Sequence, residues 1–278
     1  LAIDIGGTKI DAARVDGNGR ILDRYRAPTE GANAEDLFDG LLALVEPLLV
    51  GGALGGCGVG CGGPMTSGGE EVSPLNIPQW RRFPLRARLA ERLGMPVVVD
   101  NDAKAFALAE GRLGAAAGTS DYIALVVSTG IGAGIVVDGR LLHGRLGNAG
   151  HIGHVVVESD GPACACGGHG CLEAMASGAA LERLLGYPPA YAPDEVRRRT
   201  GRLVGRALGA VVNLLDLRLA VVGGSVALGF GETFLGFGFG ETFFGFGSGE
   251  TFLGFFGFAH VTVPVSAPIF RPGCGLSS

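Results

Sequence analysis

Long apolar runs are missing from this 278-residue chain, although its mean hydropathy is high, at +0.37. No run reaches the roughly 18–20 residues that a membrane-spanning helix needs. No basic stretch followed by an apolar one marks a secretory signal near the first residue. Lys and Arg form no cluster, and the net charge is −5. We therefore expect a cytoplasmic protein whose partners are neither membranes nor nucleic acids.

Cysteine is also scarce, with six residues in the chain. This number and its distribution fit a reducing compartment better than a disulfide framework. We interpret three of the six as inert small packing residues and not as reactive groups: Cys57, Cys61 and Cys274.

The other three cysteines stand close together, next to a histidine. His154 precedes Cys164, Cys166 and Cys171, and glycines fill much of the space between them. One imidazole and three thiols at this spacing suit a tetrahedral zinc ion, and four protein ligands close the site, which makes it structural and not catalytic. The alternative is ordinary buried cysteine packing.

Two stretches about 120 residues apart have the same pattern of strand, Gly-rich loop, strand, turn and strand. The first covers residues 1–27, with a hairpin signal at 16–19. In the second, a strand at 123–127 leads into a Gly loop at 128–134 and a strand at 135–137. This repetition predicts a duplicated α/β domain, with a mixed sheet and flanking helices in each half. A nucleotide could bind with its phosphates held by both loops.

The first loop offers a carboxylate, bare backbone, a hydroxyl and a cation in succession. Glycines let N–H groups approach a phosphate closely, and the carboxylate could hold Mg²⁺. The spacing is neither that of a Walker A loop nor that of a Rossmann fingerprint, and an ordinary hairpin turn is the alternative. The residues concerned are Asp4, Gly6, Gly7, Thr8 and Lys9.

Further polar residues stand at strand ends and in loops. Asp102 follows an apolar strand, where open α/β sheets place ligands, and it could accept a proton from an attacking hydroxyl. One residue of Asp100-Asn101-Asp102 is expected to cap the next helix instead. Asn76 lies in a loop and could bind a sugar hydroxyl or close a turn. His151 and Glu173 flank the cysteine cluster.

The last fifth of the chain is compositionally abnormal. Gly-Glu-Thr-Phe recurs at 231–234, 240–243 and 249–252, and eleven of the fifteen Phe lie between 230 and 258. The segment has neither helix nor strand periodicity, so we interpret it as a low-complexity expansion with poor order and a tendency to aggregate.

Taken together, residues 1–227 resemble the ROK family of bacterial sugar kinases and sugar-responsive repressors. The matching motifs are Asp4–Lys9, Leu75–Trp80, Asn101–Ala103, Ser128–Gly132, Gly153-His154, Cys164–Glu173 and Val221–Gly224. The resemblance implies an actin-like ATPase fold with two ribonuclease-H-like lobes. We expect an N-terminal lobe over 1–110, a C-terminal lobe with the zinc cluster over 111–227, repeats over 228–258 and a degenerate tail over 259–278.

The resemblance also implies roles for single residues. Asp102 falls at the position of the catalytic base, and the zinc ligands are His154, Cys164, Cys166 and Cys171. Sugar hydroxyls are contacted at the positions of Asn76, Asn101, His154 and Glu173. The two Gly loops fall at phosphate-contacting positions, with Thr129, Gly130 and Gly132 from the second loop, and Gly223 and Gly224 fall on the adenosine side.

Two departures from the family pattern stand out. His151 replaces the usual Glu. A Glu carboxylate accepts hydrogen bonds from two sugar hydroxyls, whereas a neutral imidazole accepts one hydrogen bond and donates one, so this replacement affects sugar preference. After Val226 the Phe/Gly repeats interrupt the expected helices; Val261–Pro264 could be the late strand, and Pro272–Gly275 replaces the final helix.

Three hypotheses follow. The first is a cytoplasmic kinase of glucose-type hexoses that uses ATP and Mg²⁺, carries structural Zn²⁺ and forms a homodimer or homotetramer, with polyphosphate as an alternative donor. The second is a sugar-binding regulator, although family repressors carry a DNA-binding segment ahead of the first Gly loop, where this chain begins. The third is a damaged, non-catalytic relative, because of the abnormal residues 228–278.

Overall fold

The computed structural model describes residues 1–238, 245–247 and 260–264, which form two compact units. The first unit contains residues 1–114 and 142–150, and the second contains 115–141 together with the described residues from 151 onward. Among the described residues, no helix has the length and apolar character to cross a membrane.

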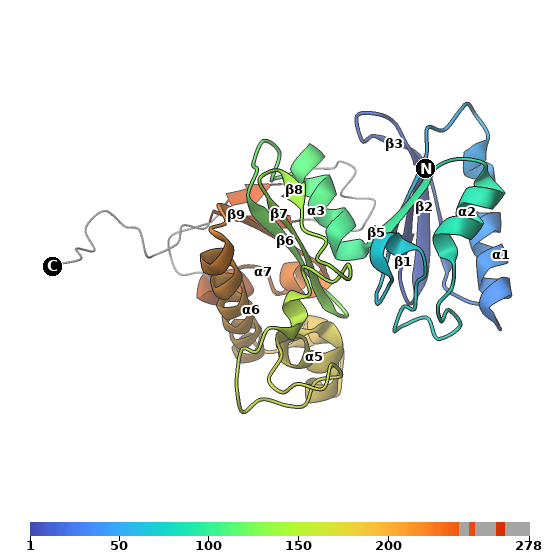
Figure 1. The fold of residues 1–278 in the computed structure, drawn as a ribbon. Helices are drawn as coiled ribbons and strands as arrows, with labels where there is room; N and C mark the ends of the chain where they lie inside the picture. Colours follow the sequence, from blue (N-terminus) through green and yellow to red (C-terminus); the bar gives the residue numbers. More distant parts are fainter. Residues whose placement is uncertain (239–244, 248–259, 265–278) are drawn as a thin grey trace. The chain divides into compact units, whose positions relative to one another are not determined.

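The first unit is built on a five-stranded mixed sheet, coloured blue to cyan in Figure 1. The strand order is β3-β2-β1-β4-β5, in which β1 runs antiparallel to β2 and parallel to β4, and β4 runs parallel to β5. The strands are β1 (Ala2–Ile5), β2 (Lys9–Val15), β3 (Ile21–Pro28), β4 (Cys57–Cys61) and β5 (Val97–Asn101).

The helices of the first unit are α1 (Ala34–Val45), α2 (Leu85–Leu93) and α3 (Asp102–Leu113), with short 3-10 turns at Glu46–Leu49 and Ser67–Gly69. α1 and α2 lie on one side of the sheet (Figure 1). They cover an apolar core to which alternate strand residues contribute, among them Ile3, Ile5, Ile10 and Ala12. Ala2 and Ala13 belong to a separate cluster that also includes Ala105 of α3. Because successive strand residues alternate between faces, Asp4 and Asp11 share this second face.

The second unit has a six-stranded sheet in the order β10-β11-β9-β6-β7-β8. Its strands are β6 (Tyr122–Val127), β7 (Ile131–Val137), β8 (Arg140–Leu141), β9 (Leu219–Gly223), β10 (Gly245–Gly247) and β11 (His260–Pro264). Its helices are α4 (Leu172–Ala176), α5 (Gly178–Leu185), α6 (Asp194–Leu215) and α7 (Ser225–Gly238), with 3-10 turns at Ile152–His154 and Pro189–Tyr191.

The two sheets repeat one topology. In each unit, three consecutive strands form an antiparallel meander (β1-β2-β3 and β6-β7-β8), and a later strand joins the first of them in parallel (β4 and β9). The predicted α/β architecture with two mixed sheets and flanking helices is confirmed. The predicted extent of the second loop was wrong: Gly132 and Gly134 lie within β7, where they pair with Val126 and Ala124. Backbone pairing there overrides the weak strand propensity of glycine.

The chain after Val226 also differs from the prediction of no regular structure. α7 extends past the first Gly-Glu-Thr-Phe repeat to Gly238, with a kink at Gly231, whose φ of +56° and ψ of −140° are not helical. Phe230 and Phe234 are buried four residues apart, and Gly201 of α6 lies against the backbone of Phe234. This close packing between two helices stabilises a helix that glycine-rich sequence does not predict. The expected late strand is present as β11, whereas residues 239–244, 248–259 and 265–278 lie outside the described residues.

Candidate active site and metal centre

Three parallel strands of the first unit end side by side. The pairing of β1 with β4 places Asp4 opposite Gly60, and that of β4 with β5 places Gly60 opposite Asp100. The carboxyl ends of parallel strands are where open α/β sheets bind ligands. The sheet therefore brings the first Gly loop and the Asp100–Asp102 segment to the same edge.

The three polar residues at the start of α3 make different contacts. Asn101 is the N-cap: its side-chain oxygen accepts a hydrogen bond from the N–H of Ala103, at 3.1 Å. Asp100 accepts the N–H of Asn101 at 2.8 Å and lies 3.6 Å from the ammonium group of Lys104. Asp102 is the first residue of the helix and is exposed. Of the two carboxylates in this segment, that of Asp102 is therefore the more exposed, whereas Asp100 is held by Lys104.

Asp4 has an unusual electrostatic environment. The pKa of its carboxyl group is raised to about 7, chiefly by burial and then by the charges of Asp102 and Asp11, although Lys9 and Arg24 act to lower it. Cys61, beneath the same strand ends, has its thiol pKa raised by burial and then by Asp102 and Asp4. A cation placed here would favour the ionised form of Asp4, which fits the chemistry of a Mg²⁺ site.

The first Gly loop is held by a neighbouring segment. Thr29 donates its hydroxyl to the carbonyl of Gly6 at 2.7 Å, and its N–H donates to the carbonyl of Thr8 at 3.1 Å. A Cβ on Gly7 would overlap the Cβ of Asn76. The glycine at position 7 is therefore required by the close approach of Asn76, and the loop and this predicted sugar-binding residue lie together.

In the second unit, the loop between β6 and β7 is three residues long, Ser128–Gly130. The carbonyls of Ser128 and Thr129 accept the N–H groups of Gly178 and Ala179 at the start of α5. Thr129 and Gly130 are exposed, and so are available to a ligand.

The loop after β9 lies against this one. Gly224 has φ +101°, and a Cβ there would overlap the carbonyl of Val127. The hydroxyl groups of Ser128 and Ser225 are 2.9 Å apart. The predicted phosphate-side loop and adenosine-side loop are therefore adjacent, at the carboxyl ends of the parallel strands β6 and β9.

The predicted metal ligands converge. The ligand atoms of His154, Cys164, Cys166 and Cys171 all lie within 4.8 Å of one another. The Sγ of Cys164 is 3.6 Å from Nδ1 of His154, and the Sγ atoms of Cys166 and Cys171 are 3.7 Å apart. Zn–S bonds of about 2.3 Å and Zn–N bonds of about 2.0–2.1 Å at tetrahedral angles require ligand separations of about 3.5–3.8 Å. The donor set and its spacing thus fit a zinc ion.

The environment of the thiols is compatible with this fit. The pKa of Cys171 is raised to about 12, chiefly by burial and then by the proximity of Cys166 and Cys164. The pKa of exposed Cys166 is lowered, chiefly by a hydrogen bond from the backbone of Gly168. Thiols this close together can all be ionised at the same time only when a cation is bound between them.

The cluster is connected directly to Glu173. α4 begins immediately after Cys171, and Glu173 Oε2 accepts the N–H of Ile131 at 2.9 Å. Gly153 fits between Ile131 and Glu173, since a Cβ on Gly153 would lie 2.5 Å from the carbonyl of Ile131 and 3.2 Å from Glu173 Cβ. His151 is exposed, and its ring lies 6.3 Å from that of His154 at an interplanar angle of 17°.

The predicted residues therefore form two groups, one in each unit. In the first unit, Asp4, the Gly loop, Asn76, Asn101 and Asp102 lie along one sheet edge; in the second, the remaining predicted residues surround the loops after β6 and β9 and the cysteine cluster.

The sequence analysis missed a third feature, in the first unit. The ammonium of Lys104, 1% exposed, donates to the carbonyl of Gly147 at 2.6 Å, and Asp100 also lies 3.5 Å from Nδ1 of His143. The spacing of Asp100 and Lys104, four residues apart, was the available signal.

Comparisons with known proteins agree with this geometry. N-acetylmannosamine kinase of Citrobacter koseri is 39% identical over 83% of this chain and 84% of its own length, and that of Escherichia coli (strain SMS-3-5) is 37% identical over 84% and 87%. A ROK family glucokinase of Streptomyces griseus, solved with glucose and AMPPNP, superposes with a TM-score of 0.72 at 35% identity and covers 84% of this chain and 85% of that one.

The ROK hexokinase of Thermus thermophilus gives a TM-score of 0.73 at 38% identity, again over 84% and 85% of the two chains. The actin-like ATPase fold expected from the sequence is thereby confirmed. The family model described as "ROK family" matches residues 1–229. The chain belongs to the ROK family.

Proposed function

We propose that this protein transfers the γ-phosphoryl group of ATP to the 6-hydroxyl of a hexose. Its similarity to sugar kinases over more than four fifths of its length supports this class of enzyme. The observation that carries the proposal within this chain is the exposed Asp102, at the same sheet edge as the Gly6–Thr8 loop and Asp4.

In this reaction Asp102 accepts the proton of the sugar 6-hydroxyl. The O6–H bond breaks, O6 forms a bond to the γ-phosphorus, and the bond from that phosphorus to the β,γ-bridging oxygen breaks, which releases ADP. A carboxylate is a weak base, but a loose phosphoryl transition state demands little proton transfer early on. Each unit offers a Gly loop whose backbone N–H groups and threonine hydroxyl, Thr8 in the first unit and Thr129 in the second, are suited to bind phosphate oxygens. Mg²⁺, held by Asp4 directly or through water, would neutralise phosphate charge.

The cysteine cluster serves this reaction through His154. With Nδ1 directed at the thiols, a metal on that atom leaves Nε2 protonated, so His154 donates a hydrogen bond to a sugar oxygen. Zn²⁺ held by His154 and the three cysteines would fix the ring and the adjacent α4, which carries Glu173. The zinc role is structural, because four protein ligands leave no position for water.

Glucose and N-acetylmannosamine are the two sugars that the relatives suggest, and we propose N-acetylmannosamine as the preferred one. The two curated relatives described above are kinases of that sugar, and they cover 83–84% of this chain. His151 stands where kinases of the family usually carry Glu. A neutral imidazole both donates and accepts, so it matches a different set of sugar groups than a carboxylate, which only accepts.

A coupled assay for ADP tests both statements. Zinc-replete full-length protein is given ATP, Mg²⁺ and, in turn, glucose, mannose, N-acetylmannosamine or N-acetylglucosamine. We expect turnover with N-acetylmannosamine above that with glucose, and His151→Glu should shift the ratio of kcat/KM values toward glucose. If glucose is the better substrate of the unchanged protein, the sugar assignment is wrong. Absence of turnover with all four sugars, by protein that is folded, would favour a non-catalytic relative.

A further inference from the structure

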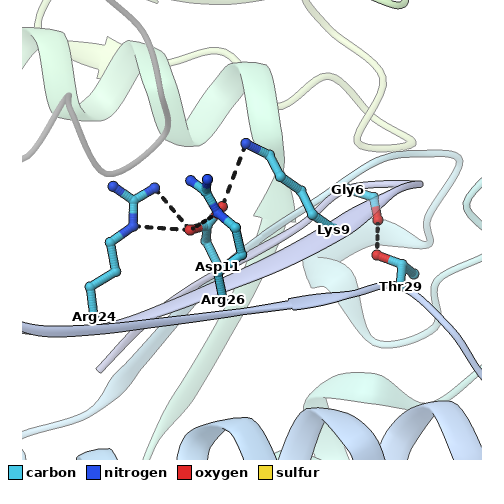
Figure 2. A network of polar contacts seen from close by, with 6 residues as sticks. All are labelled: Gly6, Lys9, Asp11, Arg24, Arg26 and Thr29. Carbon is cyan, nitrogen blue, oxygen red and sulfur yellow. Dashed lines mark hydrogen bonds and ion pairs between the residues drawn. The ribbon is translucent and has the colours of Figure 1, made fainter.

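A group of three cations surrounds a single buried carboxylate on the first sheet (Figure 2). Asp11 is 1% exposed, and its Oδ1 accepts hydrogen bonds from Nε of Arg24 and Nε of Arg26, each at 2.9 Å. The ammonium of Lys9 lies 3.7 Å from Oδ2. We call Lys9, Arg24 and Arg26 the cationic strip.

The strand register places this strip on the same face of the sheet as Asp4. Asp4 pairs with Asp11 across β1 and β2, and Asp11 pairs with Arg26 across β2 and β3. Directly paired residues point to the same face. Lys9 is the first residue of β2, immediately after the Gly6–Thr8 loop, so the strip begins at the end of that loop and continues across the next strand.

The strip carries more positive charge than its structural role needs. One buried carboxylate is compensated by one cation with good hydrogen bonds, and Arg24, the least exposed of the three, supplies them through Nε and Nη2. The side chains of Lys9 and Arg26 are 48% and 50% exposed. The three cations face two carboxylates, Asp11 and the neighbouring Asp4, so a net positive charge remains, and an anion that binds there relieves the repulsion.

We propose that Lys9, Arg24 and Arg26 form an oligophosphate-binding strip that extends the Gly6–Thr8 loop along β2 and β3. The strip takes the phosphates of the phosphoryl donor, so this inference rests on the proposed function. Arginine suits the role because its planar guanidinium binds phosphate oxygens in pairs. The same chemistry is offered by the triphosphate of ATP and by an inorganic phosphate chain.

Direct binding measured by calorimetry tests the strip without any turnover. The ligands are ATP, inorganic tripolyphosphate and orthophosphate, each titrated into full-length protein at low and at high salt. Arg26→Gln should weaken binding of tripolyphosphate about 3- to 10-fold, and less at high salt, because exposed charges are screened. Asp11→Asn should strengthen it, since the carboxylate repels phosphate while an amide oxygen can still accept from Arg24.

Arg20→Gln is the matched control, because it removes the same charge from an exposed position in the turn between β2 and β3. Thermal unfolding of each variant shows that the fold is kept. If Arg26→Gln and Arg20→Gln bind tripolyphosphate and ATP equally well, or if Asp11→Asn weakens both, the strip is not a phosphate site.

The same titrations distinguish the two possible occupants, the triphosphate of ATP and an inorganic phosphate chain. Weakening of ATP and tripolyphosphate together by Arg26→Gln identifies the nucleotide triphosphate as an occupant. Weakening of tripolyphosphate alone identifies an inorganic chain as the occupant. Loss of binding in Arg26→Gln, in protein that phosphorylates no sugar, would overturn the proposed function and leave the strip standing, whereas sugar turnover with unchanged binding in Arg26→Gln would do the reverse.

Discussion

The backbone N–H of Ile131 donates to the carboxylate of Glu173 at 2.9 Å, which connects the first residue of β7 to the helix that follows the cysteine cluster. The two residues are 42 positions apart, and Gly153 packs tightly against both. Within the second unit, this hydrogen bond thus holds the proposed sugar-binding side chain to the residue directly after the proposed phosphate loop. A change in either one is expected to affect the other.

Replacing Glu173 by Gln and by Ala separates the hydrogen bond that this side chain accepts from Ile131 from its proposed contact with the sugar. Gln retains an oxygen that accepts the N–H of Ile131, so its stability should match that of the original protein. Ala leaves the N–H without this partner and should lower the free energy of unfolding by about 1–3 kcal/mol, as measured by urea denaturation. Both variants should raise the KM for the sugar. Equal stability of the two variants would show that the hydrogen bond contributes nothing.

Asp102→Asn should slow sugar phosphorylation about 10²–10⁴-fold while the fold is kept. An amide cannot accept the hydroxyl proton, and general-base groups typically contribute about 10²–10⁴-fold to the rate. The side chain is exposed, and Asn still accepts the N–H of Ala103, so the melting temperature should change little. The measurement is kcat in the coupled assay; a rate within a few-fold of the original enzyme would remove Asp102 from the mechanism.

The cysteine cluster should contain one zinc ion per chain. Cys166→Ser should lose the metal, as measured by inductively coupled plasma mass spectrometry, and should lower the melting temperature, because a structural zinc ion contributes its binding free energy to the folded state. His169→Asn is the control, since His169 lies in the same loop but outside the ligand set. Protein that is fully folded and contains no zinc would contradict the assignment.

Asp4 should make stability depend on pH. Its pKa rises from 3.8 to about 7 on folding, chiefly through burial, so the folded state holds a proton that the unfolded state releases. This group's contribution is therefore fully present below about pH 4 and is lost as the pH rises through 7. Asp4→Asn should gain stability relative to the original protein between pH 5 and 8, by up to roughly 4 kcal/mol, in Mg²⁺-free urea titrations. A difference that stays constant with pH would show an ordinary pKa.

Lys104→Met should loosen the segment 142–150. The change removes the hydrogen bond to the carbonyl of Gly147 and leaves Asp100 without its buried cation, at a cost of about 1–3 kcal/mol. Trypsin should then cut faster after Arg145, within that segment. Arg112→Met removes an exposed cation from the same helix and serves as the control. Unchanged cleavage in Lys104→Met would mean that other contacts hold the segment.

The sequence predicted most of what depends on local pattern. Gly94 ends α2 with φ +63°, as a C-cap glycine does, and the hairpin signal at residues 16–19 lies between β2 and β3. The cysteine cluster was predicted from spacing alone, because glycines between close ligands leave few alternatives to convergence. The repeated loop pattern predicted the duplicated topology.

What the sequence did not predict depends on contacts between distant residues. The pairing of Asp11 with Arg24 and Arg26 follows from strand register, which the separate strands do not reveal. The burial of Lys104 depends on a carbonyl 43 residues away. The helical piece that carries Phe234, after the kink at Gly231, packs where α6 offers Gly201, and composition alone does not reveal that match.

The segment 142–150 has a consequence for how the chain can be divided. It belongs to the first unit, whereas the residues on both sides of it belong to the second, so the backbone passes from one unit to the other after Gly114, after Leu141 and again after Gly150. No single cut yields two complete halves: a fragment that ends at Gly114 lacks the carbonyl that accepts from Lys104. The two units are therefore expected to fold interdependently. Two separately expressed fragments should complement each other only when the amino-terminal fragment includes residues 142–150.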